Sequence, residues 1–136
     1  PLHQTVPEVS VAVAESAPLV PNRGDAEALV REFAAAYAAG DLARFDRLFS
    51  GSDLRTVDVS AMRSRFDSTE MRFIEIRQLN WHDDSQSVRA RAAYKDTYVR
   101  LGERRAVTES GSIEWVISVH AGDARIARVD RDATVR

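Results

Sequence analysis

Apolar and polar residues first alternate with a helical period just after the proline-rich N-terminal segment. Leu29, Phe33 and Tyr37 recur every four residues and therefore fall on one face of a helix. Asp25 stands in the position of an N-cap, and Gly40 lies where a residue in the left-handed conformation commonly ends a helix. The spacing predicts a first helix that covers a core with one apolar face.

Two shorter helical patterns follow. Asp41 stands in the N-cap position of a short second helix, and Asp58 or Ser60 stands in that of a third. The short helix is defined by four apolar residues, Leu42, Phe45, Leu48 and Phe49. The third helix is defined by apolar residues at i, i+3 and i+7, which are Val59, Met62 and Phe66. Each helix therefore has an apolar face to bury.

Beyond residue 70 the period changes from helix to strand. The alternation predicts strands over residues 71–81, 88–98, 107–119 and 124–129. Adjacent Phe73 and Ile74 break the alternation of the first strand and predict a bulge there. Gly102 and Gly122 lie in the connections before and after the third strand, where hairpins need positive φ. Helices that precede an antiparallel meander indicate an α+β domain.

Composition narrows the function classes. The 136-residue chain is 44% hydrophobic and 29% charged, which is ordinary for one globular domain. Its 19 basic and 21 acidic residues give a net charge of −2, and the arginines are spread along the chain, so nucleic acid is not an expected partner. No uncharged stretch is long enough to span a bilayer. The absence of cysteine excludes thiol catalysis, disulfides and thiolate metal ligands.

The two ends of the chain differ from its middle. Residues 1–24 contain all four prolines and no sustained period, so we expect a flexible linker, then a domain at residues 25–132 and a tail at 133–136. Alternating valines at residues 9–13 leave a short edge strand as the alternative to the linker. A start at Pro1 without methionine is typical of a fragment, and we expect the C-terminal module of a larger bacterial protein. Both cytoplasm and periplasm remain open as its compartment.

Three stretches carry a resemblance to a known family. They are AYAAGDLARFDRLFS at residues 36–50, GSIEW at 111–115 and ARIARVD at 124–130. Together they resemble the nuclear transport factor 2-like superfamily, which includes SnoaL-like cyclases and ketosteroid isomerase. The resemblance implies a cystatin-like cone, in which N-terminal helices pack in the concave face of a curved antiparallel sheet. That fold hosts enzymes, ligand binders and dimerising modules, so it does not imply one activity.

The catalytic residues of ketosteroid isomerase have no clear counterparts in this chain. Its helix-one tyrosine, which helps to form an oxyanion hole, falls on Phe33 when the AGDL stretches are matched. Its general-base aspartate has only Asp58 nearby, in a segment with a helical pattern. The resemblance therefore implies a non-catalytic, appended domain of this superfamily.

Two acidic residues, Asp96 and Glu109, fall on the mainly apolar side of their predicted strands. Inside an apolar cone, paired carboxylates raise the pKa of one member and can supply a general base. The alternative is that both lie near strand ends in solvent, or pair with Arg100 or Arg105. Three aromatic residues line the same space, as a ligand pocket or as packed core: Tyr37, Tyr94 and Trp115.

Neither a metal nor a cofactor is expected. His3, His82 and His120 have no metal-ligand spacing. No glycine-rich phosphate loop and no nucleophile motif occurs in the sequence.

Two function classes remain, and we favour the first. It is a non-catalytic accessory module that dimerises or binds a small hydrophobic ligand or a protein partner. The second is a small cofactor-independent isomerase, lyase or cyclase that acts on a hydrophobic substrate with a carboxylate base. For the first class, the outer face of the sheet is the predicted homodimer surface, with Glu114 of one chain against Arg89 or Arg91 of the other.

Overall fold

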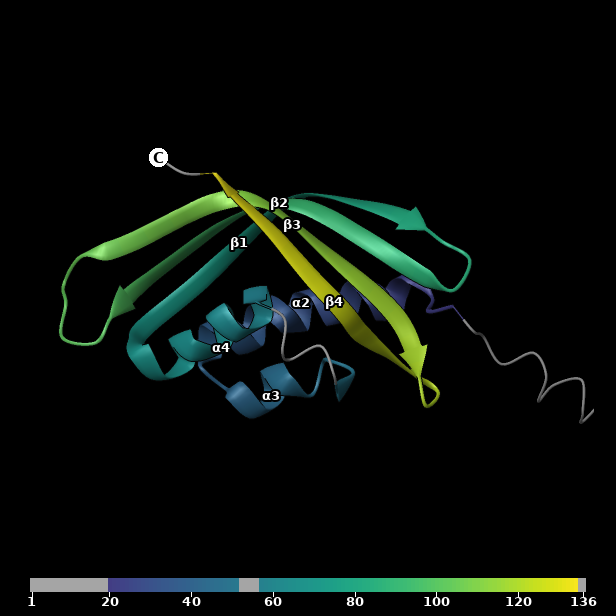
Figure 1. The fold of residues 1–136 in the computed structure, drawn as a ribbon, viewed down its shortest axis with the longest axis horizontal. Helices are drawn as coiled ribbons and strands as arrows, with labels where there is room; N and C mark the ends of the chain where they lie inside the picture. The colour runs from purple at the N-terminus through teal and green to yellow at the C-terminus, as the bar shows by residue number, and fades with distance from the viewer. Residues whose placement is uncertain (1–19, 52–56, 135–136) are drawn as a thin grey trace, which may run out of the picture.

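A curved antiparallel sheet of four strands covers three helices of the described residues with its concave face (Figure 1). The computed structural model describes residues 20–51 and 57–134. In chain order the elements are α2 (Arg23–Ala39), α3 (Leu42–Asp46), α4 (Val57–Ser68), β1 (Thr69–Asp83), β2 (Ser87–Arg100), β3 (Ala106–His120) and β4 (Asp123–Thr134). Strands that follow one another in the chain pair with one another in the sheet. The predicted α+β cone is confirmed.

Helix α2 begins earlier than predicted. Its N-cap is Asn22 and not Asp25, because the Asn22 side chain accepts a hydrogen bond of 2.8 Å from the Asp25 amide. The predicted end of the first helix at Gly40 and the predicted start of the second at Asp41 are confirmed, but α3 ends at Asp46, so Leu48 and Phe49 of the predicted short helix lie beyond it. Gly40 adopts the left-handed conformation with φ 70°, and Asp41 caps α3 by accepting from the Arg44 amide at 3.1 Å. Residues 1–19, with the predicted linker and the alternative strand at 9–13, lie outside the described residues.

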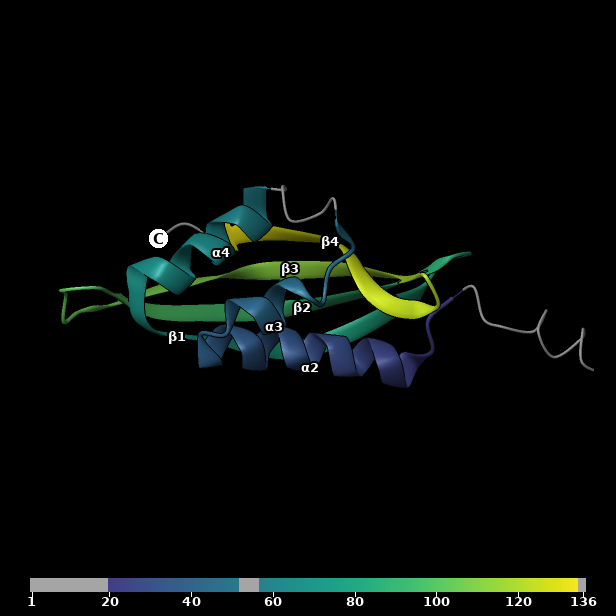
Figure 2. The same cartoon turned by 90° about the horizontal axis from the view of Figure 1, so that it is seen from below.

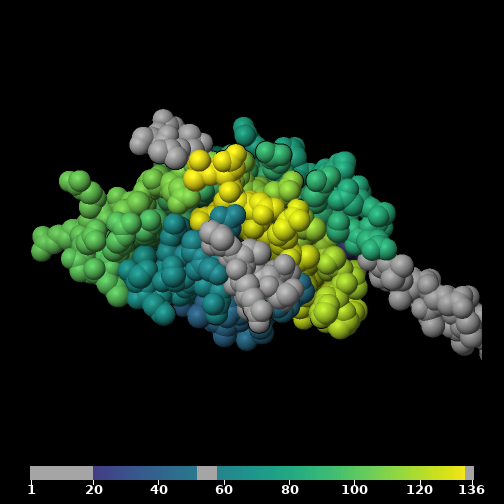
Figure 3. Space-filling model, viewed as in Figure 1, coloured from purple at the N-terminus to yellow at the C-terminus, as the bar shows by residue number. Residues whose placement is uncertain are grey.

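Helix α4 is present, but its predicted caps are wrong. Asp58 and Ser60 both lie inside the helix, which already includes Val57. The carboxylate of Asp58 instead accepts a hydrogen bond of 2.8 Å from the backbone amide of Arg131 in β4. Viewed from below, α2 lies toward the β1 edge of the sheet and α4 toward the β4 edge (Figure 2). The surface view shows the atoms of α4 beside those of β4 (Figure 3).

The pairing of β1 with β2 shifts register at two places, and neither is the predicted bulge. Pairing with β2 is continuous through Phe73 and Ile74, so the bulge predicted there is wrong. The register shifts instead lie between Thr69 and Met71 and between Arg77 and Asn80. Phe73 breaks the sequence pattern for another reason: it points to the outer face and is 53% exposed, while Ile74 is buried below the sheet. An exposed apolar residue next to a buried one gives the same sequence pattern as a β-bulge.

Aromatic side chains from α2, α3 and β3 fill the centre of the cone. The ring centroids of Phe33 and Trp115 lie 5.5 Å apart in an edge-to-face arrangement, and those of Phe33 and Phe45 lie 5.2 Å apart. Phe33, Phe45 and Trp115 have no exposed surface. The apolar face predicted for the first helix is therefore buried at Phe33, and Trp115 is part of the packed core.

Substitution of the buried tryptophan tests this packing. Trp115→Ala is expected to lower the free energy of unfolding by about 3 to 5 kcal/mol, because it leaves a large cavity beside Phe33. The matched control is Val116→Ala on the opposite face of β3, which is expected to cost less than about 1 kcal/mol. Chemical denaturation measures both variants, and equal losses of stability would contradict the assignment of the core.

Candidate functional site

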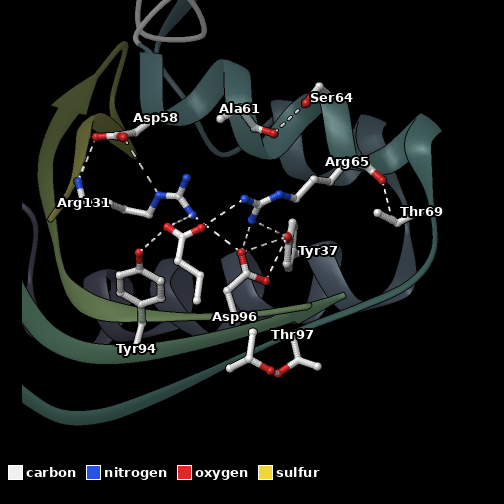
Figure 4. A network of polar contacts seen from close by, with 12 residues as sticks. Tyr37, Asp58, Ala61, Ser64, Arg65, Thr69, Tyr94, Asp96, Thr97 and Arg131 are labelled. Atoms are coloured by element: carbon white, nitrogen blue, oxygen red, sulfur yellow. Dashed lines mark hydrogen bonds and ion pairs between the residues drawn. The ribbon is translucent and has the colours of Figure 1, made fainter. Parts of the chain in front are cut away.

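Six side chains from five elements meet inside the cone, between α4 and the inner face of the sheet (Figure 4). We call them the interior ion cluster: Tyr37, Arg65, Tyr94, Asp96, Glu109 and Arg131. The two acidic members lie directly opposite each other in the β2–β3 register. Their side chains share the inner face because residues paired in an antiparallel ladder point to the same side of the sheet.

Asp96 is an acidic residue of the cluster that has no exposed surface. The Tyr37 hydroxyl donates to both of its carboxylate oxygens, at 3.0 and 3.1 Å. The Arg65 guanidinium forms an ion pair with Asp96 through Nη1, and Nη1 of Arg131 lies 3.5 Å from the same oxygen. A buried carboxylate is stable only with such partners, because it has lost its hydration.

Glu109 faces the same two arginines from β3, but its side chain keeps 25% of its surface exposed. The Tyr94 hydroxyl donates to Oε2 of Glu109 at 2.8 Å, and Nη2 of Arg65 donates to Oε1 at 3.2 Å. Nη1 of Arg131 lies 4.0 Å from Oε2. Arg65 therefore connects the two carboxylates across β2 and β3.

The arginines are the part of the site that the sequence did not predict. Arg65 comes from the last turn of α4, and Arg131 from the part of β4 beyond the predicted strand at 124–129. The predicted alternative, in which the acids pair with Arg100 or Arg105, is wrong, since Arg100 instead stacks on the Tyr98 ring at 5.5 Å. Arg131 is a charged residue at an inward-facing position, so it interrupts the alternation of apolar residues. For this reason the predicted strand ended at Val129.

The predicted aromatic residues separate into two groups. Tyr37 and Tyr94 belong to the interior ion cluster, and each donates its hydroxyl to one acid. Trp115 packs in the aromatic core against Phe33, and its indole nitrogen has no hydrogen-bond partner among the described residues. The structure therefore brings together four of the five predicted pocket residues and places Trp115 in the core.

The pKa values of the two acids are shifted in opposite directions by their surroundings. Burial raises the pKa of Asp96, because desolvation outweighs the two arginines and the tyrosine hydroxyl that favour its charged form. Burial also acts to raise the pKa of Glu109, but the Tyr94 hydroxyl and the arginines outweigh it and lower that pKa. Burial raises the pKa of Tyr37 and of Tyr94, so that both phenols remain protonated donors.

The acidic groups of the cluster have their partners among its own side chains. No three metal-ligating side chains converge among the residues that the structure describes. Both carboxylates already have cationic partners and phenolic donors.

None of the described helices has the length and apolar character needed to cross a membrane.

Comparison with known proteins finds similarity in structure and not in sequence. No protein-family model matches the chain, and no curated protein gives a significant match. A provisionally named aromatic ring hydroxylase from Novosphingobium aromaticivorans superposes with a TM-score of 0.70 at 15% identity, over 84% of this chain and 90% of that one. A nuclear transport factor 2-like superfamily protein from Salmonella enterica gives 0.66 at 12% identity, over 79% and 87%. A hexachlorocyclohexane dehydrochlorinase gives 0.68 at 6% identity, over 83% and 85%.

The chain has the nuclear transport factor 2-like fold. Within this fold, α2 places Phe33 in the aromatic core and Tyr37 in the interior ion cluster. Identities of this size establish the fold alone, so they transfer no activity from the similar proteins.

The lowered pKa of Glu109 predicts how stability depends on pH. The ordinary pKa is 4.5 and the folded value lies below it, so Glu109 stabilises the fold above pH 4.5 and loses this contribution as the pH falls further. In Glu109→Gln, the loss of stability between about pH 5 and pH 3 should be smaller than in the unmodified chain. Thermal unfolding across this range measures it, with Glu103→Gln in the exposed hairpin as the control. An unchanged slope in Glu109→Gln would contradict the assignment.

Proposed function

We propose that this domain is a non-catalytic accessory module that pairs with a second copy of itself through the outer face of its sheet. The non-catalytic role is supported by one observation: both carboxylates of the interior ion cluster are already bound by side chains of the same chain. A general base must reach the proton that it removes. Asp96 is fully buried and bound to Arg65 and Tyr37, and Glu109 is bound to Arg65 and Tyr94. These contacts suit a structural role for both carboxylates.

The outer face supports pairing through an apolar patch at one end. Phe73 is 53% exposed and Met71 is 46% exposed, and both lie on the outer side of β1. Their partners in the register are Thr97 and Val99 on the outer side of β2. Large apolar side chains exposed together on a sheet face favour contact with another protein surface.

Charges in the middle of the same face make it self-complementary. Arg91 of β2 lies directly opposite Glu114 of β3, and neither forms an ion pair with another residue in the described part of the chain. A twofold axis near this position brings Arg91 of each copy toward Glu114 of the other, as a cyclic dimer requires. The occupant that we propose for this face is therefore a second copy.

Light scattering at micromolar concentration tests the pairing. We expect the unmodified chain to have twice its monomer mass, and Phe73→Glu to be a monomer, because it places a charge in the apolar patch. Leu101→Glu is the matched control, since Leu101 is 58% exposed but lies in the β2–β3 hairpin and not on the sheet face. A monomeric unmodified chain, or a dimer that survives Phe73→Glu, would refute the proposed interface.

The alternative function is a small cofactor-independent isomerase, lyase or cyclase. Its support is that a dehydrochlorinase shares the fold and that Asp96 lies inside the cone with a raised pKa. Such an enzyme needs Arg65 to leave the carboxylates so that a hydrophobic substrate can enter. We favour the non-catalytic role because Arg65 contacts both acids and the Tyr37 hydroxyl.

A further inference from the structure

The guanidinium of Arg65 is held in the way that proteins hold a bound cation. Its two terminal nitrogens contact three acceptors, which are Asp96, Glu109 at 3.2 Å and the Tyr37 oxygen at 3.2 Å. Its central carbon lies 4.2 Å from the centre of the Tyr98 ring. Carboxylates at the edges and an aromatic ring on the face match the planar fork of a guanidinium group.

The walls of this cage do not depend on the helix that supplies the cation. Tyr37 comes from α2, Asp96 and Tyr98 from β2, and Glu109 from β3, whereas Arg65 comes from α4. The carboxylates also keep their own donors, because Tyr37 hydrogen-bonds to Asp96 and Tyr94 hydrogen-bonds to Glu109. The acceptors are therefore fixed in place by contacts other than those with Arg65.

Arg131 cannot neutralise the cage alone. Its Nη1 approaches Asp96 to 3.5 Å and Glu109 to 4.0 Å, and this nitrogen forms no hydrogen bond among the described residues. Without Arg65, two carboxylates would share one buried guanidinium that contacts both weakly. The cage then lacks one positive charge, and its open edges present oxygen acceptors to N–H donors.

We propose that Tyr37, Asp96, Tyr98 and Glu109 form a guanidinium-binding site that Arg65 occupies in cis. The ligand class is an alkylguanidinium cation, such as the side chain of an arginine presented by a partner. A primary ammonium fits less well, because it lacks the planar fork that donates to both carboxylates at once. The site goes beyond the proposed pairing of two copies, since it lies between the helices and the inner face of the sheet, whereas the pairing surface is the outer face.

The test is rescue of Arg65→Ala by ethylguanidinium, read as thermal unfolding of the full chain. Ethylguanidinium at millimolar concentration should raise the melting temperature of this variant along a saturating curve, by about 4 °C at about ten times its dissociation constant. Methylammonium at equal ionic strength should give a much smaller rise. The double variant Arg65→Ala with Glu109→Gln should lose the rise, because one wall of the cage is gone.

A second arginine of α4 provides the matched control. Arg63 pairs with Asp46 at 2.8 and 3.0 Å, but both side chains are partly exposed, in contrast to the buried Asp96. Arg63→Ala should show no rescue by ethylguanidinium, and neither should the unmodified chain, in which Arg65 fills the site. If Arg65→Ala is unfolded without the additive, ethylguanidinium should restore folding. Equal effects of ethylguanidinium on both alanine variants, or none on Arg65→Ala, would overturn the proposal.

Discussion

A carboxylate without exposed surface needs charged and hydrogen-bonding partners, and Asp96 obtains them from three other elements of the fold. Tyr37 reaches it from α2, Arg65 from α4 and Arg131 from β4. Each partner must arrive at one point, because a buried charge with a missing partner destabilises the fold strongly. The need of Asp96 for these partners therefore constrains where α4 lies over the sheet. Apolar packing alone would constrain that position less specifically.

Two faces of one sheet have different roles in this account. The inner face holds the aromatic core at one end and the interior ion cluster at the other, and both carboxylates of the cluster have partners within the chain. The outer face keeps Phe73 exposed and leaves Arg91 and Glu114 unpaired among the described residues. Interaction with another molecule is accordingly expected at the outer face. The inner face becomes available only when Arg65 leaves its cage.

The parts of the fold that follow from local periodicity could be predicted from the sequence. The apolar spacing of Phe33 and Tyr37, the left-handed Gly40 and the alternation of β2 each depend on a few neighbouring residues. The same parity argument placed Asp96 and Glu109 on the inner face. The cap at Asn22 was missed because Asp25, three residues later, has an equally suitable side chain.

The partners of the acids could not be predicted, because they depend on tertiary structure. Arg65 lies 31 residues before Asp96 in the chain, and nothing in the local pattern of α4 marks it as inward-facing. Arg131 ended the predicted strand, since a charge at an inward position looks like the end of an apolar alternation. Phe73 was misread in the opposite sense, because an exposed apolar side chain looks like a buried one.

Asp96 and its arginines form one structural unit if the loss of one partner removes most of what the other contributes. A double-mutant cycle between Arg65→Met and Asp96→Asn, read as the free energy of unfolding, measures this dependence. We expect a coupling energy of about 2 kcal/mol or more, with the double variant losing much less stability than the two single losses together. The same cycle between Arg63 and Asp46, which are partly exposed, should give less than about 1 kcal/mol. Additive losses for Arg65 and Asp96 would show that the two side chains stabilise the fold independently.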